Sequence, residues 1–253
     1  MAIIDPLLVM KMPRKLTAAG GIDAVTHALE SYVSVCATPF TQGHAREALR
    51  LLFKYLPRAY VKGEGDPEAR EQVHYASTIA GMSFANAFLG ICHSMAHKLG
   101  AAFHVPHGIA NAALISHVIA YNATDCPFKM ATFSQYLHPS ALAQYADLAR
   151  FLGFCTPAEG DEEAVLRLIE EVEALKTALD IPATLKEIVG ATHEAEFLKA
   201  LDELAENAFD DQCTGANPRY PLIADLRGMY KAAWEAPILP LSHLQAYKPA
   251  HHS

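Results

Sequence analysis

The sequence is poor in long apolar runs, in basic residues and in paired cysteines. No apolar run reaches the about 18 residues that a membrane-spanning helix needs, so we expect no membrane segment. The net charge of -8, with histidines neutral, argues against nucleic acid and an anionic membrane surface as partners. The 5 cysteines include no CxxC pair, which disfavours a disulfide framework or a zinc ribbon. Free thiols fit a reducing compartment, and we expect a cytoplasmic protein.

The sequence also lacks an alternation of strands and helices, and it has no GxGxxG motif. Apolar residues recur instead at helical spacing along most of the chain. Thr17 is expected to cap the first helix, and Asp66 with Pro67 to begin the third. The pattern predicts an all-α fold, with helices over residues 15–35, 41–56, 66–88, 90–103, 107–123, 138–153, 161–180, 192–209 and 222–236.

The first residues, AIIDPLLVM, are the single strand candidate. An apolar strand without partner strands is unusual at a terminus, which suggests that this segment has been severed from a larger sheet. We therefore expect residues 1–15 to be an extended remnant of a domain junction. Residues 16–240 would form a helical metal-binding domain, and residues 241–253 are left unassigned.

Four histidines lie in the stretch CHSMAHKLGAAFHVPHG. His93 and His97 are four residues apart in a predicted helix, so both rings can face one point. Upstream, Asp23 and His27 have the same spacing and would form a clip of one oxygen and one nitrogen. His107 follows a proline at the start of the next helix, from where its ring can turn back toward the preceding helix.

These residues predict a divalent-metal site but leave the metal open. One carboxylate with three imidazoles suits zinc, iron(II), nickel or cobalt. A lone His27 on an apolar face has the alternative interpretation of a hydrogen-bonded core histidine. His104 and His117 lie outside the pattern and are expected to be structural. The candidate ligands are Asp23, His27, His93 and His107.

The stretch GICHSMAHKLGAAFHVPHG resembles the signature of the iron-containing (group III) alcohol dehydrogenases, and GGIDAVTHALESYVS resembles that family's second signature. AFDDQCTGANPRYP is similar to the alcohol dehydrogenase half of bifunctional aldehyde–alcohol dehydrogenases. The likeness covers residues 2 to about 235. It implies an N-terminal α/β domain that binds NAD(P) and a C-terminal helical domain that holds the metal. This chain matches only the second, so we expect the dinucleotide-binding domain to be absent and NAD(H) to be bound mainly by that missing domain.

The resemblance also implies roles for individual residues. His97 would be catalytic, as a proton-relay group one turn beyond His93 and not a ligand. Phe84 and Cys213 would line the substrate channel, with a core aromatic and a buried thiol as the alternative interpretations. The metal would be Fe(II), with zinc possible in its place, bound by Asp23, His27, His93 and His107.

The implied activity is that of an iron-dependent, NAD-linked alcohol dehydrogenase that interconverts a short-chain aldehyde and a primary alcohol, in fermentative aldehyde reduction. The partners would be this small substrate and further copies of the chain, as a homo-oligomer or as a filament in a full-length bifunctional protein. Two alternatives stay open. A metal-dependent hydrolase or lyase would need a general base, for which Glu30 is the nearest candidate, although a solvated helix residue is the simpler interpretation of Glu30. An isolated metal-binding or assembly module would have no activity of its own.

Overall fold

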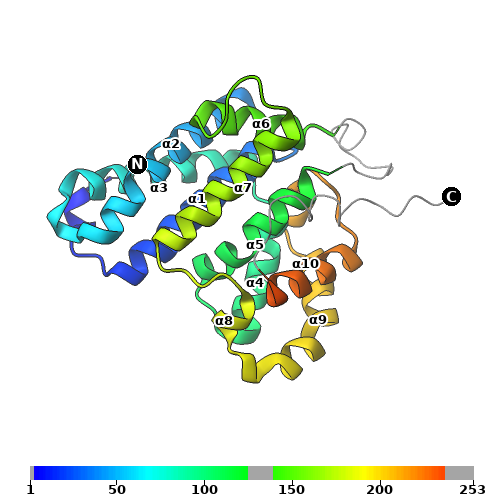
Figure 1. Ribbon diagram of the computed structural model, residues 1–253. Helices are drawn as coiled ribbons and strands as arrows, with labels where there is room; N and C mark the ends of the chain where they lie inside the picture. Colours follow the sequence, from blue (N-terminus) through cyan, green and yellow to red (C-terminus); the bar gives the residue numbers. More distant parts are fainter. Residues whose placement is uncertain (1–2, 125–138, 237–253) are drawn as a thin grey trace.

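The computed structural model describes residues 3–124 and 139–236. This described part is helical and contains no strand, which confirms the predicted all-α class (Figure 1). The short helix α8 has no counterpart in the sequence prediction. The helices are α1 (Arg14–Val33), α2 (Pro39–Lys62), α3 (Pro67–Ala87), α4 (Ile91–Phe103), α5 (His107–Asn122), α6 (Ala141–Leu152), α7 (Asp161–Ala178), α8 (Leu185–Val189), α9 (Glu194–Phe209) and α10 (Ile223–Glu235).

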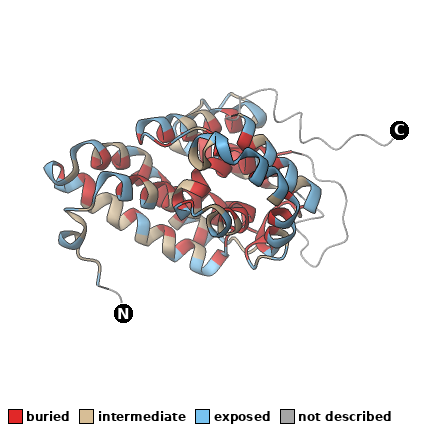
Figure 2. Ribbon diagram, turned by 90° about the horizontal axis from the view of Figure 1, so that it is seen from below, coloured by how far each residue is buried: buried red, intermediate tan, exposed pale blue. Residues whose placement is uncertain are grey.

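Helix α1 lies at the centre of the fold. Its sequence places small and apolar residues on every side, and such a helix is stable only when other elements surround it. Helices α2 and α3 pack against it, as do α5 and α6. Buried residues are concentrated where these helices meet (Figure 2). Polar side chains in the middle of α1 are therefore held inside the protein.

The remaining helices form two groups around α1. Helices α2 and α3 pack together, and α6 packs with α7; on the other side α4, α5, α9 and α10 pack against one another (Figure 1). One continuous cluster of buried apolar residues joins the two groups. Within it the Trp234 indole stacks on the Phe197 ring at a centroid distance of 4.2 Å. A shared core allows residues from both groups to meet in one site.

The chain turns sharply between α3 and α4, with a bend of 107°. Phe88 ends α3 with a positive φ of 61°, and Gly90 is the N-cap of α4. This corner directs the first turn of α4 at α1. Among the described helices none alone is long and apolar enough to cross a membrane, although the bent pair α3 and α4 passes the same test of length and composition.

The predicted helix starts are right in one case and wrong in another. Asp66 caps α3 as expected, because its carboxylate accepts a hydrogen bond of 3.1 Å from the Ala69 amide. Thr17 does not cap α1. That helix begins at Arg14 after Pro13, and the Thr17 hydroxyl donates to the Pro13 carbonyl within the first turn.

The N-terminal segment is not a strand in the structure. Residues Pro6–Val9 form a 3-10 helix, whose N-cap Asp5 accepts a hydrogen bond of 2.9 Å from the Leu7 amide. The Asp-Pro pair explains this, because the proline fixes φ and the preceding carboxylate satisfies the free amide of the turn. The tail 241–253 lies outside the described residues.

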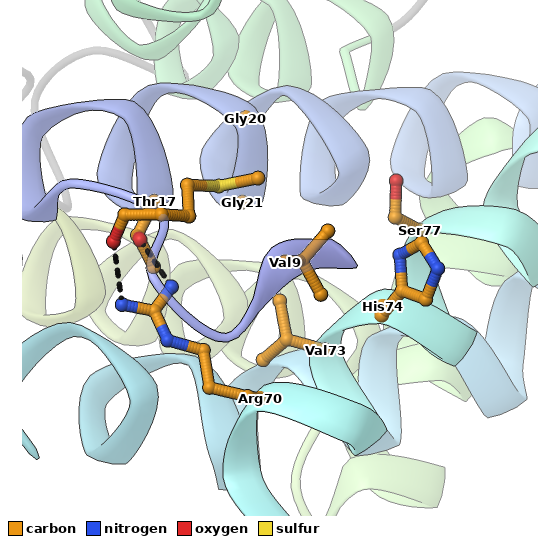
Figure 3. A pocket seen from close by; sticks show the side chains of 9 residues that line it. Val9, Thr17, Gly20, Gly21, Arg70, Val73, His74 and Ser77 are labelled. Atoms are coloured by element: carbon orange, nitrogen blue, oxygen red, sulfur yellow. Dashed lines mark hydrogen bonds between the residues drawn. The ribbon is translucent and has the colours of Figure 1, made fainter. Parts of the chain in front are cut away.

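A small cavity of about 110 Å³ lies between this 3-10 helix, α1 and α3 (Figure 3). The buried Arg70 guanidinium closes one side, where it donates to the Thr17 hydroxyl and to the Met12 carbonyl. These bonds fasten the N-terminal segment to α3. The lining residues include none of the predicted metal ligands; they are Val9, Met12, Thr17, Gly20, Gly21, Arg70, Val73, His74 and Ser77.

Candidate metal centre

Three helices bring the four predicted ligands together. Asp23 and His27 lie one turn apart on the inward face of α1. His93 lies in the first turn of α4, and His107 is the first residue of α5. One ligand atom from each of the four lies within 4.8 Å of all the others. Residues far apart in sequence thus converge as the spacing predicted.

The Asp23 carboxylate is the centre of this cluster. Its Oδ1 lies 3.3 Å from His107 Nε2 and 3.6 Å from His93 Nε2, and its Oδ2 lies 3.7 Å from His27 Nε2. In a tetrahedral site with bonds of about 2.1 Å, neighbouring donor atoms are about 3.4 Å apart. The spacings between the carboxylate and the three imidazoles are therefore close to those of a single divalent-cation site.

Gly108 permits the close contact between α5 and α1. A Cβ at this position would lie 2.0 Å from the Ala19 carbonyl oxygen and 3.2 Å from Asp23 Cβ. Only glycine allows the first turn of α5 to rest on the backbone of α1. This contact places His107 directly beside Asp23.

Glu30 is not the solvated residue that the sequence suggested. It is only 2% exposed, and its Oε2 lies 2.5 Å from His93 Nδ1. Its Oε1 accepts a hydrogen bond of 2.7 Å from the Cys92 amide. The position two turns after Asp23 on the same inward face was the signal for burial. Because both oxygens are engaged behind the His93 ring, the structure argues against the general-base role that a hydrolase or lyase would require.

The electrostatics of the cluster favour an ionised Asp23 and a neutral His27 but a protonated His93. Burial lowers the pKa of His27 to about 4, which leaves its imidazole neutral. Burial acts to raise the pKa of Asp23, but the hydrogen bond with His93 and the neighbouring imidazoles outweigh it and lower that pKa. Burial acts against a charge on His93 as well, yet the carboxylates of Glu30 and Asp23 raise its pKa to about 9. His93 is therefore the ligand from which a cation must displace a proton.

Asn111 is a member of the site that the sequence reasoning missed. It is fully buried on α5, and its Nδ2 donates a hydrogen bond of 2.7 Å to Asp23 Oδ1. The same nitrogen lies 3.2 Å from Nε2 of His93 and 3.2 Å from Nε2 of His107. Its position four residues after His107, on the same helix face, was the available signal. The amide nitrogen thus lies against the same Nε2 atoms that would bind a cation, so a bound cation would replace these two contacts, while the hydrogen bond to Asp23 could remain.

His97 lies beside the four-residue cluster and is not part of it. Its ring stacks on the His107 ring at 5.4 Å, and its Nδ1 lies 3.0 Å from Asp211 Oδ2. Lys98 Nζ lies 2.9 Å from the same oxygen. Burial acts to raise the Asp211 pKa, but the Cys213 amide, Lys98 and His97 together lower it to about 2. Asp211 lies in the motif AFDDQCTGANPRYP, but this motif indicated no role for it.

The two predicted channel residues lie beside different histidines. The half-buried Phe84 ring is 4.4 Å from the His27 ring. Cys213 is buried, with its sulfur within 4.8 Å of a ring nitrogen of His97 and an oxygen of Asp211. Burial, with Glu30 and Asp211 nearby, raises the pKa of this thiol to about 12. A neutral thiol is a poor metal ligand, and the channel role of both residues stays a prediction.

The two histidines expected to be structural lie outside both clusters. His104 is exposed and ends α4 in the left-handed conformation, with φ of 55°. His117 is buried on α5.

The described helices gather one carboxylate and three imidazoles, and together they define a candidate metal-binding helical domain. Residues 17–234 match the family described as "Fe-containing alcohol dehydrogenase family, C-terminal". The chain belongs to this family, as the sequence motifs indicated.

Curated relatives include the bifunctional aldehyde-alcohol dehydrogenase AdhE of Escherichia coli (strain K12), which is 56% identical over 227 residues. That match covers 90% of this chain and 25% of the relative. The NADPH-dependent butanol dehydrogenase of Clostridium saccharobutylicum is 44% identical over 218 residues, covering 86% of this chain and 50% of the relative. The chain therefore spans a quarter to a half of the length of these relatives.

Solved structures give the same result. The crystal structure of 1,3-propanediol oxidoreductase matches with a TM-score of 0.79 and 33% identity, over 91% of this chain and 55% of that one. The iron-containing alcohol dehydrogenase from Thermococcus thioreducens matches with a TM-score of 0.76 and 35% identity, over 92% of this chain and 54% of that one. The helical fold is thus that of the corresponding part of these enzymes.

Proposed function

We propose that this chain is the metal-binding catalytic part of an NAD(H)-linked alcohol dehydrogenase that interconverts a short-chain aldehyde and a primary alcohol, acting in fermentative aldehyde reduction. The observation that carries the proposal is the convergence of Asp23, His27, His93 and His107 in a chain of the iron-containing alcohol dehydrogenase family. Relatives named as aldehyde-alcohol and butanol dehydrogenases support the substrate class.

The proposed metal is Fe(II), with zinc as the alternative, and the four residues above would hold it. Bound there, a divalent cation supplies Lewis-acid polarisation of the substrate oxygen. The chain's own contribution is to fix the donor atoms. Asn111 orients Asp23 through a hydrogen bond of 2.7 Å. The close backbone approach at Gly108 keeps His107 beside Asp23.

His97 is the proposed proton-relay residue. Its Nδ1 lies against the Asp211 carboxylate, so Nε2 is free to take a proton from an alcohol or return one to it. Imidazole suits this role because one ring nitrogen can accept a proton while the other holds one. Asp211 fixes the orientation of the ring, as a carboxylate does for a catalytic histidine.

Phe84 and Cys213 are the proposed walls of the substrate channel. The Phe84 ring lies against His27, and the Cys213 thiol lies beside His97, so apolar or weakly polar groups flank the site. Such walls suit a short alkyl chain better than a charged substrate. The nicotinamide is the hydride carrier in this proposal, and we assign its binding mainly to a dinucleotide-binding domain of the kind that the family resemblance implies.

The test has a binding arm and a turnover arm. The purified chain is loaded with Fe(II), Zn(II) or Co(II), and the metal content is measured for the wild type and for His97→Ala. We expect one metal ion in both proteins. The chain is then fused to the dinucleotide-binding part of the E. coli relative, and NADH consumption with acetaldehyde is followed. Absence of metal in the wild type, or a loaded fusion that consumes no NADH with any short-chain aldehyde, would overturn the proposal.

We also propose that copies of the chain associate. Ile3, Leu7 and Leu8 are 82%, 77% and 82% exposed, and exposed apolar groups of this size favour self-association. Sedimentation velocity of the wild type and of a Leu7→Lys, Leu8→Lys variant tests this. A larger species in the wild type that is lost in the variant would support association, and a monomeric wild type would contradict it.

A further inference from the structure

We infer that Glu30 is a positioning residue of the metal centre, which holds His93 in the orientation and tautomer that direct Nε2 at a bound cation. This inference rests on the proposed metal site. Glu30 lies in the stretch GGIDAVTHALESYVS, where the family resemblance implies metal-ligand roles for Asp23 and His27 but no role for Glu30. In this inference the metal centre consists of the four ligands and one buried carboxylate, Glu30, which contacts the ligand His93 on the ring nitrogen that does not bind the metal.

The first line of support is the pairing of the two nitrogens of His93. Nε2 faces Asp23 Oδ1 at 3.6 Å, and Nδ1 faces Glu30 Oε2 at 2.5 Å. A carboxylate accepts hydrogen bonds, so Nδ1 must carry the hydrogen, and Nε2 is left to present its lone pair to a cation. Hydrogen bonds of this kind fix the tautomer and the ring orientation of metal-binding histidines.

The second line of support is the place of Glu30 at the start of α4. Gly90, the N-cap residue, has no side chain to satisfy the free amides of the first turn. Glu30 Oε1 accepts the Cys92 amide at 2.7 Å, and the Asn217 side chain accepts the Ile91 amide at 3.3 Å. The carboxylate is therefore stabilised by a helix N-terminus while it holds a residue of the same turn.

Gly90 shows that this arrangement is tightly built. A Cβ on Gly90 would lie 2.9 Å from Glu30 Oε1 and 2.7 Å from Asn217 Oδ1. The backbone of α4 thus approaches the carboxylate as closely as glycine permits. With Glu30 and His93 only 2% and 1% exposed, water cannot replace either partner.

The substitution Glu30→Gln separates positioning from packing. Glutamate offers two acceptor oxygens to two donors, the Cys92 amide and His93 Nδ1–H. Glutamine has nearly the same shape but offers one acceptor and one donor. Either the helix amide or His93 Nδ1–H is then left without a partner whenever Nε2 binds a cation. We expect the affinity for Zn(II), measured by competition with a chelator, to fall about 10–100-fold, which is typical for outer partners of metal-binding histidines.

Glu173→Gln is the matched control. Glu173 is a partly buried carboxylate whose Oε1 accepts from both the Ser116 hydroxyl and the Lys176 ammonium, so glutamine at this position keeps an acceptor for both donors. Neither Ser116 nor Lys176 belongs to the metal cluster. We expect its Zn(II) affinity to equal that of the wild type, with circular dichroism showing equal helicity in all three proteins.

A spectroscopic measurement covers the case in which Glu30→Gln does not fold. Nitrogen-15 NMR of the zinc-loaded wild type reports which ring nitrogen of His93 carries a hydrogen. We expect the hydrogen on Nδ1, hydrogen-bonded to Glu30. A hydrogen-free Nδ1 in the wild type, or a folded Glu30→Gln variant with unchanged Zn(II) affinity, would overturn the inference. A wild type that binds no metal would instead overturn the proposed function, so the two failures are distinguishable.

Discussion

Two clusters of potential ligands lie side by side in this molecule, and they differ in their neighbours. The Asp23 cluster combines one carboxylate with three imidazoles, and its hydrogen-bond partners include a neutral amide, Asn111, and a buried carboxylate, Glu30. The His97, Asp211 and Cys213 cluster is as compact, with ligand atoms also within 4.8 Å of one another. There, however, Lys98 lies 2.9 Å from the only carboxylate.

The difference shows that compactness alone does not define a metal site. An ammonium group on Asp211 already neutralises the charge that a cation would need, and the Cys213 thiol is held protonated, with its pKa raised to about 12 by burial and the nearby carboxylates. In the described part of the chain, neither Asp23 nor Glu30 forms an ion pair with a lysine or an arginine. This difference supports the proposal that the first cluster binds the cation and that His97 of the second cluster handles protons.

Loss of a ligand should give the largest effect. We expect His93→Ala and His107→Ala to reduce metal affinity more than the about 10–100-fold expected for an outer partner, because each removes one of four donors. His97→Ala should change it far less. Metal content after dialysis against a weak chelator measures all three. Equal loss in the His97 variant would place His97 among the ligands and merge the two clusters into one.

The sequence predicted the residues of the first cluster because helical spacing is a local property. Residues at i and i+4, such as Asp23 with His27, share a helix face whatever the tertiary fold. Glu30 and Asp211 were not predicted because their partners come from other helices or from a loop distant in sequence. Whether a glutamate on α1 is solvated depends on the corner after α3, which brings the free amides of α4 against it.

The N-terminal strand was predicted wrongly for a related reason. Apolar residues without periodicity favour a strand in the absence of other information, but a strand needs a partner to accept its hydrogen bonds. Asp5 and Pro6 favour a local turn instead, and the short 3-10 helix satisfies its own backbone. Local turn chemistry decided the structure of this segment.

Substitution of Gly108 tests whether the helix contact builds the first cluster. Gly108→Ala places a Cβ 2.0 Å from a backbone oxygen of α1, and we expect a loss of about 1–3 kcal/mol in the free energy of unfolding, as for overpacked sites. Gly20→Ala is the control, because a Cβ there meets no atom within 4 Å. Because alanine is more favourable than glycine within a helix, Gly20→Ala should raise the free energy of unfolding by about 0.5–1 kcal/mol. Chemical denaturation measures both, and an unchanged stability for Gly108→Ala would mean that the helices are not in close contact.

In the second cluster, the lowered pKa of Asp211 predicts that the wild type and an Asp211→Asn variant differ in stability by an amount that depends on pH. The Asp211 pKa is lowered from 3.8 to about 2 in the folded protein. The ionised Asp211 therefore stabilises the folded protein fully at pH values above its unfolded-state pKa, and this stabilisation is lost as the pH falls toward about 2. It contributes at most about 2 kcal/mol to the free energy of unfolding. Asp211→Asn should be less stable than the wild type at pH 6, and the gap should narrow as the pH falls below 4. A gap in the free energy of unfolding that stays constant between these pH values would contradict an ionised, paired Asp211.

Substitution of Cys213 should have the smallest effect on metal affinity, and this result would separate the two clusters most clearly. If the second cluster handles protons and not metal, Cys213→Ala should leave metal affinity unchanged, because no donor of the first cluster is touched. The thiol itself should react slowly with iodoacetamide, since it is buried and its pKa is raised to about 12. Cys36, which is half-buried, is the internal control for reagent access. Peptide mass spectrometry at pH 8 should therefore show Cys36 labelled before Cys213. Faster labelling of Cys213, or a loss of metal in its alanine variant, would give the second cluster a reactive thiolate and return it to the candidates for metal binding.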